Sequence, residues 1–475
     1  MSEGDLALNA LELDTVLLSP DRTCLEILDQ TLLPGEVKTL RLSDMRDIRE
    51  AIHSLRVRGA PAIGVCAGYA LALAASQIET EDREAFFVRL RETKEYLASA
   101  RPTAVNLFWA LERMWQTAQT HADETVPAIR EALFAEAQRI RDEDVAISRS
   151  IGELGFALLH HGDGILTHCN AGTLATAKYG TATAPMYIAL ERGWNDLRVY
   201  CDETRPLLQG ARLTALEMQA AGLDTTLLCD NAASSLMQTG KVNIIFVGCD
   251  RVARNGDAAN KIGTSAVAIL AKHYGIPFYV CAPSSTIDMS LASGAEIPIE
   301  QRAAEEVTEM WYKKRMAPEG IGVYNPAFDV TDHSLITGII TERGVVGIIS
   351  SVGKHYSYGL TLMNGNVTVS AKIGSSGINA PLRWDGLSSS GARLSDIPPH
   401  HNIAPGDTVR TSGFSSIFPA DIPIGVSTGT RLVDGSTVSV DVELFQDFSN
   451  VHYVTIVENR DKAEIEALEK AEEKR

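Results

Sequence analysis

Cysteine and aspartate recur at the ends of short apolar segments in the middle of the chain. Five such segments, GILTHC, DLRVYCDE, TTLLCD, NIIFVGCD and PFYVCAP, each have a Cys near the end, and in three of them an Asp follows it directly. Thiol and carboxyl groups can both take part in proton transfer. If the segments are parallel strands of one sheet, their carboxyl ends meet at one edge, where α/β proteins bind ligands. The sequence therefore predicts a catalytic centre at this edge.

Two of these strand-end residues have surroundings suited to chemistry. Cys169 precedes Asn170-Ala171-Gly172-Thr173, which is expected to open a helix whose N-terminal dipole would lower the pKa of the thiol. A small buried apolar role is the alternative for Cys169. Asp250 follows the apolar run IIFVGC, and a carboxyl group at the mouth of such a strand is expected to have the raised pKa of a general acid. Capping of the next segment is the alternative for Asp250.

A phosphate-binding element is expected near residue 58. The Arg58 guanidinium and the Gly59-Ala60 backbone before Pro61 can supply donors of fixed geometry to a phosphate group. Neither a GxGxxG nor a GxxxxGK[ST] pattern occurs in a suitable place, so no dinucleotide or nucleoside triphosphate is implied. The pair Gly256-Asp257 before Ala258 is interpreted as a helix entry instead.

Metal binding is expected to be absent. The strand-end cysteines could gather around zinc if the sheet is parallel, but their spacings are irregular. The pairs His160-His161 and His400-His401 place adjacent side chains in diverging directions, which makes them poor chelates.

Three kinds of sequence pattern predict the elements that position these residues. Apolar periodicity predicts helices near 62–77, 83–98 and 104–120 and over the segment AIREALFAEAQRIRDEDVAISRSIGELGFALLH. From residue 165 onward strands alternate with helices, which indicates a parallel α/β sheet with crossover helices. After about Gly344, alternating β-branched residues in VTVSAKIG and STVSVDVELF indicate a separate all-β region.

Composition places the chain among globular proteins. Of its 475 residues, 45% are hydrophobic and 22% are charged, and the length suits about three domains. The net charge of -18 disfavours nucleic acid and anionic membrane surfaces as partners, although local Arg and Lys can still bind a small anionic metabolite.

Cysteine usage and the apolar runs predict a cytoplasmic protein. Seven cysteines, an odd number without CxxC spacing, indicate free thiols in a reducing compartment, and the acidic N-terminus does not look like an export signal. Residues 59–78, GAPAIGVCAGYALALAASQI, have the length of a membrane span but consist mainly of Ala and Gly, so we expect a buried helix.

Five ordered segments carry a family resemblance. They are VRGAPAIG (57–64), RPTAVNL (101–107), ILTHCNAGTLAT (165–176), DETRPLLQGARLTA (202–215) and GCDRVARNGDAANKIGT (248–264). Their order, spacing and residue types resemble those of the methylthioribose-1-phosphate isomerase family over about residues 10–344. The wider superfamily also holds archaeal ribose-1,5-bisphosphate isomerases and regulatory subunits of a eukaryotic translation initiation factor.

The resemblance assigns roles to particular positions. It implies that Cys169 is the active-site cysteine and that Asp250 is the acid/base residue. The implied substrate-binding positions are Arg58, Gly59, Ala60, Arg101, Gln209, Asn260 and Lys261. Cys249 is a departure, because the family usually has Ala there. The family also implies a homodimer that acts on a phosphorylated sugar without a cofactor.

The implied reaction converts 5-methylthioribose 1-phosphate into 5-methylthioribulose 1-phosphate in methionine salvage. Hydrogen would move between C2 and C1 either through an enediol or as hydride. Two alternatives are kept: an isomerase of ribose 1,5-bisphosphate, and a non-catalytic regulatory or scaffold protein.

The C-terminal region resembles a second family. The segments VSAKIG (369–374), LSDIPPHHNIAPGD (394–407), TSGFSSIFPADIPIG (411–425) and ELFQDFSNVHYVTIVEN (443–459) are similar to the β-domain of the bacterial rod-shape-determining protein C family. The membrane helix and coiled coil that begin that family are not recognisable here, and the seam falls near residues 341–350.

These observations together predict the domain organisation. We expect a mostly helical substrate-capping domain over 1–125, a Rossmann-like parallel-sheet catalytic domain over 126–344, an all-β domain over 345–459 and a charged tail over 460–475.

Overall fold

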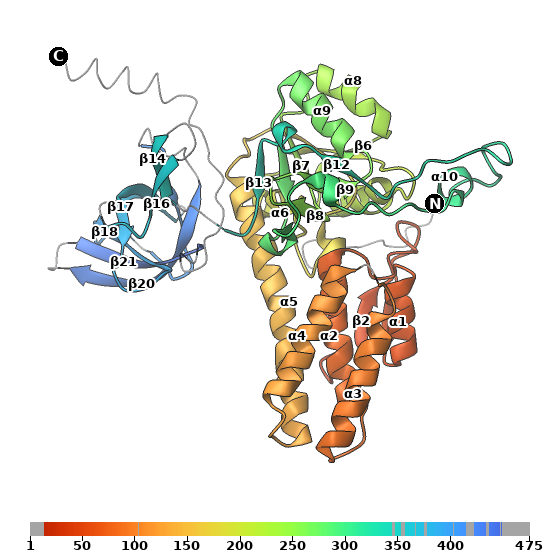
Figure 1. The fold of residues 1–475 in the computed structure, drawn as a ribbon. Helices are drawn as coiled ribbons and strands as arrows, with labels where there is room; N and C mark the ends of the chain where they lie inside the picture. The colour runs from red at the N-terminus through yellow and green to blue at the C-terminus, as the bar shows by residue number, and fades with distance from the viewer. Residues whose placement is uncertain are drawn as a thin grey trace. The chain divides into compact units, whose positions relative to one another are not determined.

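The computed structural model describes residues 14–343 except 103, and most of 347–448. The gaps in the second range are 353–356, 366, 375–377, 402, 415–421, 434–436 and 447. The described residues form two compact units (Figure 1). Residues up to 152 together with 159–340 make the first unit, and 153–158 together with residues from 341 onward make the second. The expected charged tail, 460–475, lies outside the described residues.

The first unit begins with a small antiparallel sheet and a group of helices. Its strands are β1 (Val16–Leu18), β2 (Leu25–Leu28) and β3 (Thr39–Leu42), paired in that order. The helices are α1 (Met45–His53), α2 (Ala60–Gln77), α3 (Arg83–Ala98), α4 (Val105–Thr120) and α5 (Val126–Phe156). This arrangement confirms the helical N-terminal region predicted from periodicity.

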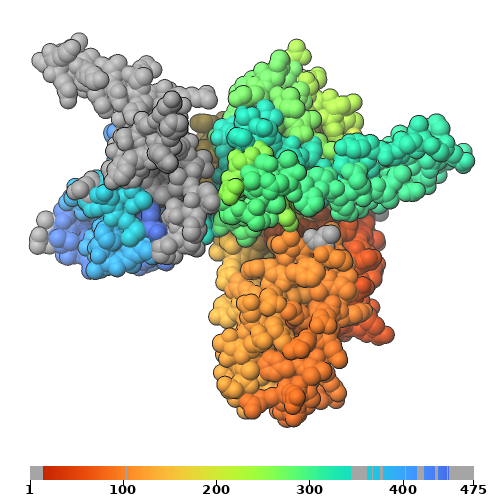
Figure 2. Space-filling model, in the orientation of Figure 1, coloured from red at the N-terminus to blue at the C-terminus, as the bar shows by residue number. Residues whose placement is uncertain are grey.

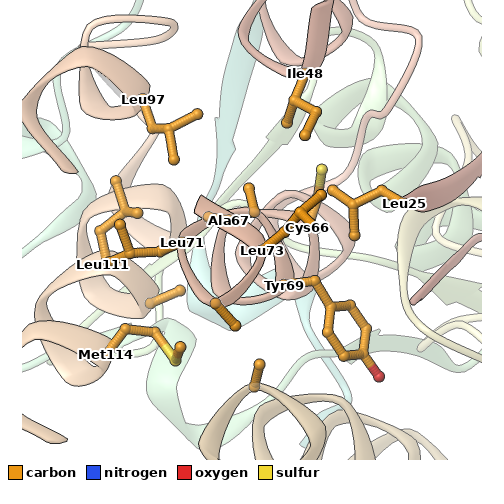
Figure 3. Close-up of a cluster of buried hydrophobic side chains, with 14 of the residues drawn as sticks. Leu25, Ile48, Cys66, Ala67, Tyr69, Leu71, Leu73, Leu97, Leu111 and Met114 are labelled. Carbon is orange, nitrogen blue, oxygen red and sulfur yellow. The ribbon is translucent and has the colours of Figure 1, made fainter. Parts of the chain in front are cut away.

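Helix α2 lies at the centre of this region and is buried on all sides. Leu71, Leu73 and Tyr69 of α2 pack with Leu111 and Met114 of α4 in one cluster of buried side chains (Figure 3). Gly64 allows the close approach of α4, since a Cβ there would stand 3.3 Å from the Asn106 carbonyl oxygen. Among the described residues, α2 is the one helix that is long and apolar enough to cross a membrane. Inside the protein, 78% of it is buried. The expectation of a buried helix is confirmed.

The second part of the first unit is a parallel sheet of six strands. They are β4 (Gly164–Thr167), β5 (Arg198–Asp202), β6 (Asp224–Leu228), β7 (Ile244–Val247), β10 (Phe278–Cys281) and β13 (Gly338–Ile340). The order across the sheet is β13-β10-β7-β4-β5-β6. The chain therefore winds outward from β4 in one direction and from β7 in the other, as in doubly wound dinucleotide-binding folds. The strand order reverses between β4 and β7, which makes their carboxyl ends the switch point where such folds bind ligands.

Short helices and a second sheet accompany these strands. The helices are α6 (Ala184–Glu191), α7 (Ala215–Ala220), α8 (Ala233–Gln238), α9 (Thr264–Tyr274) and α10 (Glu305–Thr308). The second sheet has the order β11-β8-β9-β12, with β8 (Arg251–Ala253), β9 (Ala258–Lys261), β11 (Ile287–Asp288) and β12 (Phe328–Thr331). The expectation of a helix entry at Gly256-Asp257 was wrong, because these residues form the turn of the β8–β9 hairpin, where Gly256 has a φ of +91°.

The second unit contains a closed antiparallel barrel. Its strands are β16 (Val369–Ile373), β17 (Ile378–Trp384), β18 (Gly391–Ile397), β19 (Thr408–Thr411), β20 (Pro423–Val433) and β21 (Thr437–Leu444), closed in the order β16-β17-β18-β21-β20-β19. A hairpin of β14 (Gly347–Val352) and β15 (Ser357–Thr361) precedes them. Alternate residues of β16 and β18 point into the barrel core, as the sequence alternation predicted. The expectation of a C-terminal all-β region is confirmed.

Candidate active site

Cys169 lies at the carboxyl end of β4 in an unusual backbone conformation. Its φ is +66°, a left-handed value that residues other than glycine rarely adopt. Its N–H donates to Oγ1 of Thr204 at 2.8 Å, and its carbonyl accepts from Oγ1 of Thr214 at 2.6 Å. These two threonines belong to the segments that follow β5, so neighbouring strand ends fix the orientation of Cys169.

The predicted activation of Cys169 by a helix dipole was wrong. The segment after it forms only a short 3-10 turn, Thr173–Ala175, and not an α-helix. Burial raises the pKa of the Cys169 thiol, although the charges of Arg58 and Lys261 act to lower it. The side chain is therefore a protonated thiol at neutral pH, which can give a hydrogen to a substrate or guide its transfer.

Asp250 lies at the carboxyl end of the adjacent strand, β7. Its N–H donates to the Ala259 carbonyl at 2.9 Å, which joins it to the β8–β9 hairpin. The preceding Gly248 packs against the loop after Cys169, because a Cβ at Gly248 would stand 2.4 Å from the Ala171 Cβ. Cys169 and Asp250 therefore flank the switch point of the sheet, where the sequence predicted the catalytic centre.

The surroundings of Asp250 shift the pKa of its carboxyl group in opposite directions. Asp250 is an exposed residue, although many protein atoms surround its carboxyl group. Burial raises the pKa of Asp250, while the charges of Lys261, Arg58 and Arg101 act in the opposite direction. The raised pKa that the sequence predicted is confirmed, and it means that a larger fraction of Asp250 is protonated at a given pH.

Arg58 reaches across to the loop that follows Cys169. Its Nη1 donates to Oδ1 of Asn170 at 2.6 Å, and its Nη2 donates to the Asn170 carbonyl at 3.1 Å. Next to it, Gly59 has a φ of +88°, and a Cβ there would stand 2.3 Å from the Ala175 carbonyl oxygen. Helix α2 begins at Ala60 with Pro61 in its first turn, so its free N-terminal amides lie beside the loop of residues 170–175.

Two further predicted cations, Arg101 and Lys261, act on the Asp250 carboxylate together with Arg58. Arg101 is half-buried, and its pKa is lowered by burial and by the nearby Arg58, while Asp250 acts to raise it. Lys261 ends β9, and its Nζ lies 4.3 Å from the ring centroid of Phe328. The structure thus brings Arg58, Arg101 and Lys261 to one carboxylate, an arrangement that favours an anionic ligand.

Asn260 and Gln209 complete the predicted set. Asn260 is buried on β9, and its Nδ2 donates to Oγ1 of Thr264 at 3.1 Å. Gln209 is also buried and directly precedes a π-helical turn, Gly210–Thr214, a feature found frequently at functional sites. Its Oε1 has no hydrogen-bond partner among the described residues, so a hydroxyl group of a ligand would satisfy it.

Sequence reasoning gave no role to two buried polar residues beside this site, His168 and Glu217, and it did not foresee that the strand-end Asp202 pairs with His168. His168, directly before Cys169, places Nδ1 3.1 Å from Oδ2 of Asp202 and Nε2 2.8 Å from the Ile262 carbonyl. Although burial acts to lower it, the hydrogen bond with Asp202 raises the pKa of His168. Glu217 of α7 is fully buried under the loop after Cys169. The one charged residue in the run LTALEMQA was the only signal for it.

The strand-end cysteines do not form a ligand set. All seven cysteines are described, and all are free. Within the described part of the chain, two groups of side chains have spacing that could hold a metal ion, His168 with Asp202 and Asp230, and Asp257 with Asp332 and His333. Neither contains a cysteine, so the geometry gives no support to the zinc alternative.

Comparison with known proteins decides the family. Residues 56–347, more than half of the chain, match the Initiation factor 2 subunit family. The chain belongs to this family. Within it, the chain is 61% identical to the methylthioribose-1-phosphate isomerase of Symbiobacterium thermophilum over 334 residues, covering 70% of this chain and 93% of the relative. It is 53% identical to the 5-deoxyribose 1-phosphate isomerase of Bacillus cereus, covering 68% and 92%. The chain thus lies in the sugar-phosphate isomerase branch of the family.

Solved structures of family members share the fold of the first unit. The crystal structure of 5-methylthioribose 1-phosphate isomerase from Pyrococcus horikoshii OT3 is 44% identical with a TM-score of 0.68, covering 73% of this chain and 96% of that one. The translation initiation factor eIF-2B subunit delta from A. fulgidus is 40% identical with a TM-score of 0.66, covering 70% and 96%. Residues 336–458 match a different family, the barrel core of the rod shape-determining protein MreC. The two matches overlap at 336–347, a range that partly coincides with the seam expected near 341–350.

Proposed function

We propose that the protein is an aldose–ketose isomerase that converts 5-methylthioribose 1-phosphate into 5-methylthioribulose 1-phosphate, as a step of methionine salvage. The observation that carries this proposal is the pair of Cys169 and Asp250 at the switch point between β4 and β7, with Arg58, Arg101 and Lys261 around Asp250. A protonated thiol and a carboxyl group of raised pKa can carry the proton transfers of a sugar-phosphate isomerisation, and a cluster of cations can bind the phosphate.

The blocked anomeric position explains the need for an acid. An ordinary aldose opens its ring spontaneously, but here phosphate occupies the anomeric oxygen, so the ring oxygen must be protonated as the C1–O4 bond breaks. Asp250 supplies that proton, which its raised pKa makes available. The phosphate group is bound by the cations and by the amides at the N-terminus of α2.

Cys169 is assigned to the transfer of hydrogen from C2 to C1. Substrate and product are isomers, so no external oxidant or reductant takes part. In a hydride shift, the hydrogen moves from C2 to C1 with its electron pair, and the 2-hydroxyl proton passes to the Asp250 carboxylate that has protonated the ring oxygen. In the enediol route, this carboxylate takes the proton from C2, and the Cys169 thiol gives a proton to C1 and recovers one from the 2-hydroxyl. Buried surroundings of Cys169 exclude water, which protects the open-chain intermediate from exchange with solvent.

A second candidate substrate is 5-deoxyribose 1-phosphate, on which the Bacillus cereus relative is named to act. Both sugars carry an apolar 5-substituent, whereas ribose 1,5-bisphosphate carries a second phosphate that would need its own cation. The non-catalytic alternative, motivated by the initiation-factor relative, is disfavoured because both Cys169 and Asp250 are present.

The deciding experiment is an assay of the purified full-length protein with all three sugar phosphates. We expect the highest kcat/KM with 5-methylthioribose 1-phosphate, followed by 5-deoxyribose 1-phosphate, with ribose 1,5-bisphosphate well below both. Faster turnover of the bisphosphate would move the protein to the other branch, and inactivity toward all three would favour the regulatory alternative.

We also propose a cytoplasmic homodimer. Free cysteines suit a reducing compartment. The segment that includes α10 extends from the body of the first unit and exposes several large apolar side chains (Figures 1 and 2). They are Met310, Trp311, Tyr312, Met316, Ile321 and Tyr324. Such a surface is typical of a subunit contact, so light scattering of the purified protein should give twice the mass of one chain.

A further inference from the structure

Glu217 is a buried carboxylate that the proposed chemistry does not use. It lies on α7 with no exposed surface. Its Oε1 accepts from Nδ2 of Asn170 at 2.9 Å and from the Leu174 N–H at 3.1 Å. Its Oε2 accepts from the Thr173 N–H at 2.8 Å and from the Tyr187 hydroxyl at 3.3 Å. Four donors from three elements therefore converge on one carboxyl group.

The loop after Cys169 is built directly around this carboxyl group. A Cβ at Gly172 would stand 2.1 Å from Oε2 of Glu217, so only glycine lets the loop lie this close. Every group that faces Glu217 in these contacts is a donor, so the site requires a residue that only accepts. A glutamine of the same shape would turn an NH2 group toward at least one N–H donor and leave it unpaired.

Asn170 links Glu217 to Arg58. Its Nδ2 donates to Glu217 and also to Oγ1 of Thr214 at 3.1 Å, which fixes the orientation of the amide. The amide oxygen is thereby directed at Arg58, which donates Nη1 to it at 2.6 Å. Because Nη2 of Arg58 also donates to the Asn170 backbone carbonyl, both ends of the guanidinium fork are anchored on one residue.

We propose that Glu217 is a positioning residue, which acts through Asn170 to hold the Arg58 guanidinium in place for the substrate phosphate. This inference rests on the proposed function, since it assumes that Arg58 binds the phosphate of a sugar substrate. Glu217 itself does not contact the substrate. Without Glu217 the Asn170 amide keeps only Thr214 as an acceptor for its NH2 group, so it rotates more easily and can present this group to Arg58, which would repel the guanidinium from its position.

The test compares the variants E217Q, N170A and R58A in the full-length protein. The measurements are kcat and KM for 5-methylthioribose 1-phosphate and the binding of inorganic phosphate by calorimetry. We expect E217Q and N170A each to weaken phosphate binding and raise KM about tenfold, the effect of disturbing a hydrogen bond to a charged group, with a smaller change in kcat. In the R58A background neither substitution should weaken phosphate binding further, because all of them act through one guanidinium.

A matched control is E136Q. Glu136 is also buried, but it pairs with Arg113 and Arg139 in the helical region. Its substitution should change the melting temperature without changing KM or phosphate binding.

Three outcomes separate this inference from the proposed function. If E217Q and N170A lower only the melting temperature and leave KM and phosphate binding as in the wild type, the positioning role is overturned. It is also overturned if both substitutions weaken phosphate binding equally with and without Arg58. If the wild type does not turn over the sugar, yet phosphate binding depends on Arg58, Asn170 and Glu217 as described, the positioning role stands and the proposed function fails.

Discussion

The backbone N–H of Cys169 donates to Oγ1 of Thr204 at 2.8 Å, and both residues have left-handed φ angles, +66° and +64°. A left-handed conformation costs about 1–3 kcal/mol at a residue other than glycine, and more when the residue is β-branched, as threonine is. Two such residues, bonded to each other at the ends of β4 and β5, are strained parts of a candidate site. Their hydrogen bond keeps the Cys169 backbone in the orientation that places its thiol at the switch point.

The first prediction concerns this hydrogen bond. T204V removes the hydroxyl that accepts from Cys169 and donates to the Asp202 carbonyl, so we expect kcat to fall about tenfold or more as the thiol loses its orientation. T204S keeps the hydroxyl and should retain most of the activity. Equal kcat for the valine and serine variants would show that the hydrogen bond has no part in catalysis. Turnover under saturating substrate is the measurement.

The second prediction tests the two assigned catalytic groups. C169S and D250N should each lower kcat about 10²–10⁴-fold, the usual contribution of general acid–base catalysis, with circular dichroism spectra unchanged. C249S is the matched control, since Cys249 adjoins Asp250 but donates its thiol to the backbone carbonyls of Arg251 and Ala259. Activity within threefold of wild type for C169S or D250N would remove that residue from the mechanism.

The third prediction follows from the raised pKa of Asp250. If its protonated form is the active one, kcat/KM falls as pH rises through this pKa. The positive charge of Lys261 acts to lower that pKa, so K261M should raise it and move the falling limb of the profile to higher pH, in addition to any loss of substrate affinity. D250N should lack this limb altogether. A limb that stays at the same pH in K261M would show that another group gives rise to it.

The sequence contained most of the fold and the chemical centre of the site, because both depend on local patterns. The buried helix α2 and the five Cys-ended strands follow from runs of apolar residues, and the strand ends located Cys169 and Asp250. The helix expected after Cys169 and the helix entry at Gly256 were wrong. Both segments take their conformation from tertiary packing. The loop after Cys169 packs around Glu217, and Gly256 lies in a hairpin whose strands β8 and β9 pair with β11 and β12.

Contacts between residues far apart in the sequence were not predicted, because they too depend on tertiary packing. Glu217 contacts Asn170, 47 positions away, and Asn170 contacts Arg58, 112 positions away. The sequence carries no local pattern that links these three side chains. The hydrogen bond between His168 and Asp202 joins neighbouring strands in the same way and becomes visible only when the strand order is known.

The last prediction is that a chain ending at Gly344 folds and remains active. The barrel has a hydrophobic core of its own, which is formed by residues between Leu362 and Leu444. In the described part of the chain, its six strands pair only with one another. All assigned site residues belong to the first unit. Removing residues 345–475 should therefore keep kcat/KM within about twofold of the full-length protein, as expected when two domains have independent cores.

The melting temperature of the shortened chain gives a separate reading. The end of α5 and the turn after it, residues 153–158, group with the second unit. We therefore expect a modest decrease in the melting temperature, because these residues lose their partners while the core of the first unit stays intact. A comparison chain ending at Asp332 should unfold at a much lower temperature, because it also removes β13 from the edge of the parallel sheet. If ending the chain at Gly344 lowers kcat/KM or the melting temperature as much as ending it at Asp332, the barrel is integral to the isomerase, and the boundary expected near residue 344 is wrong.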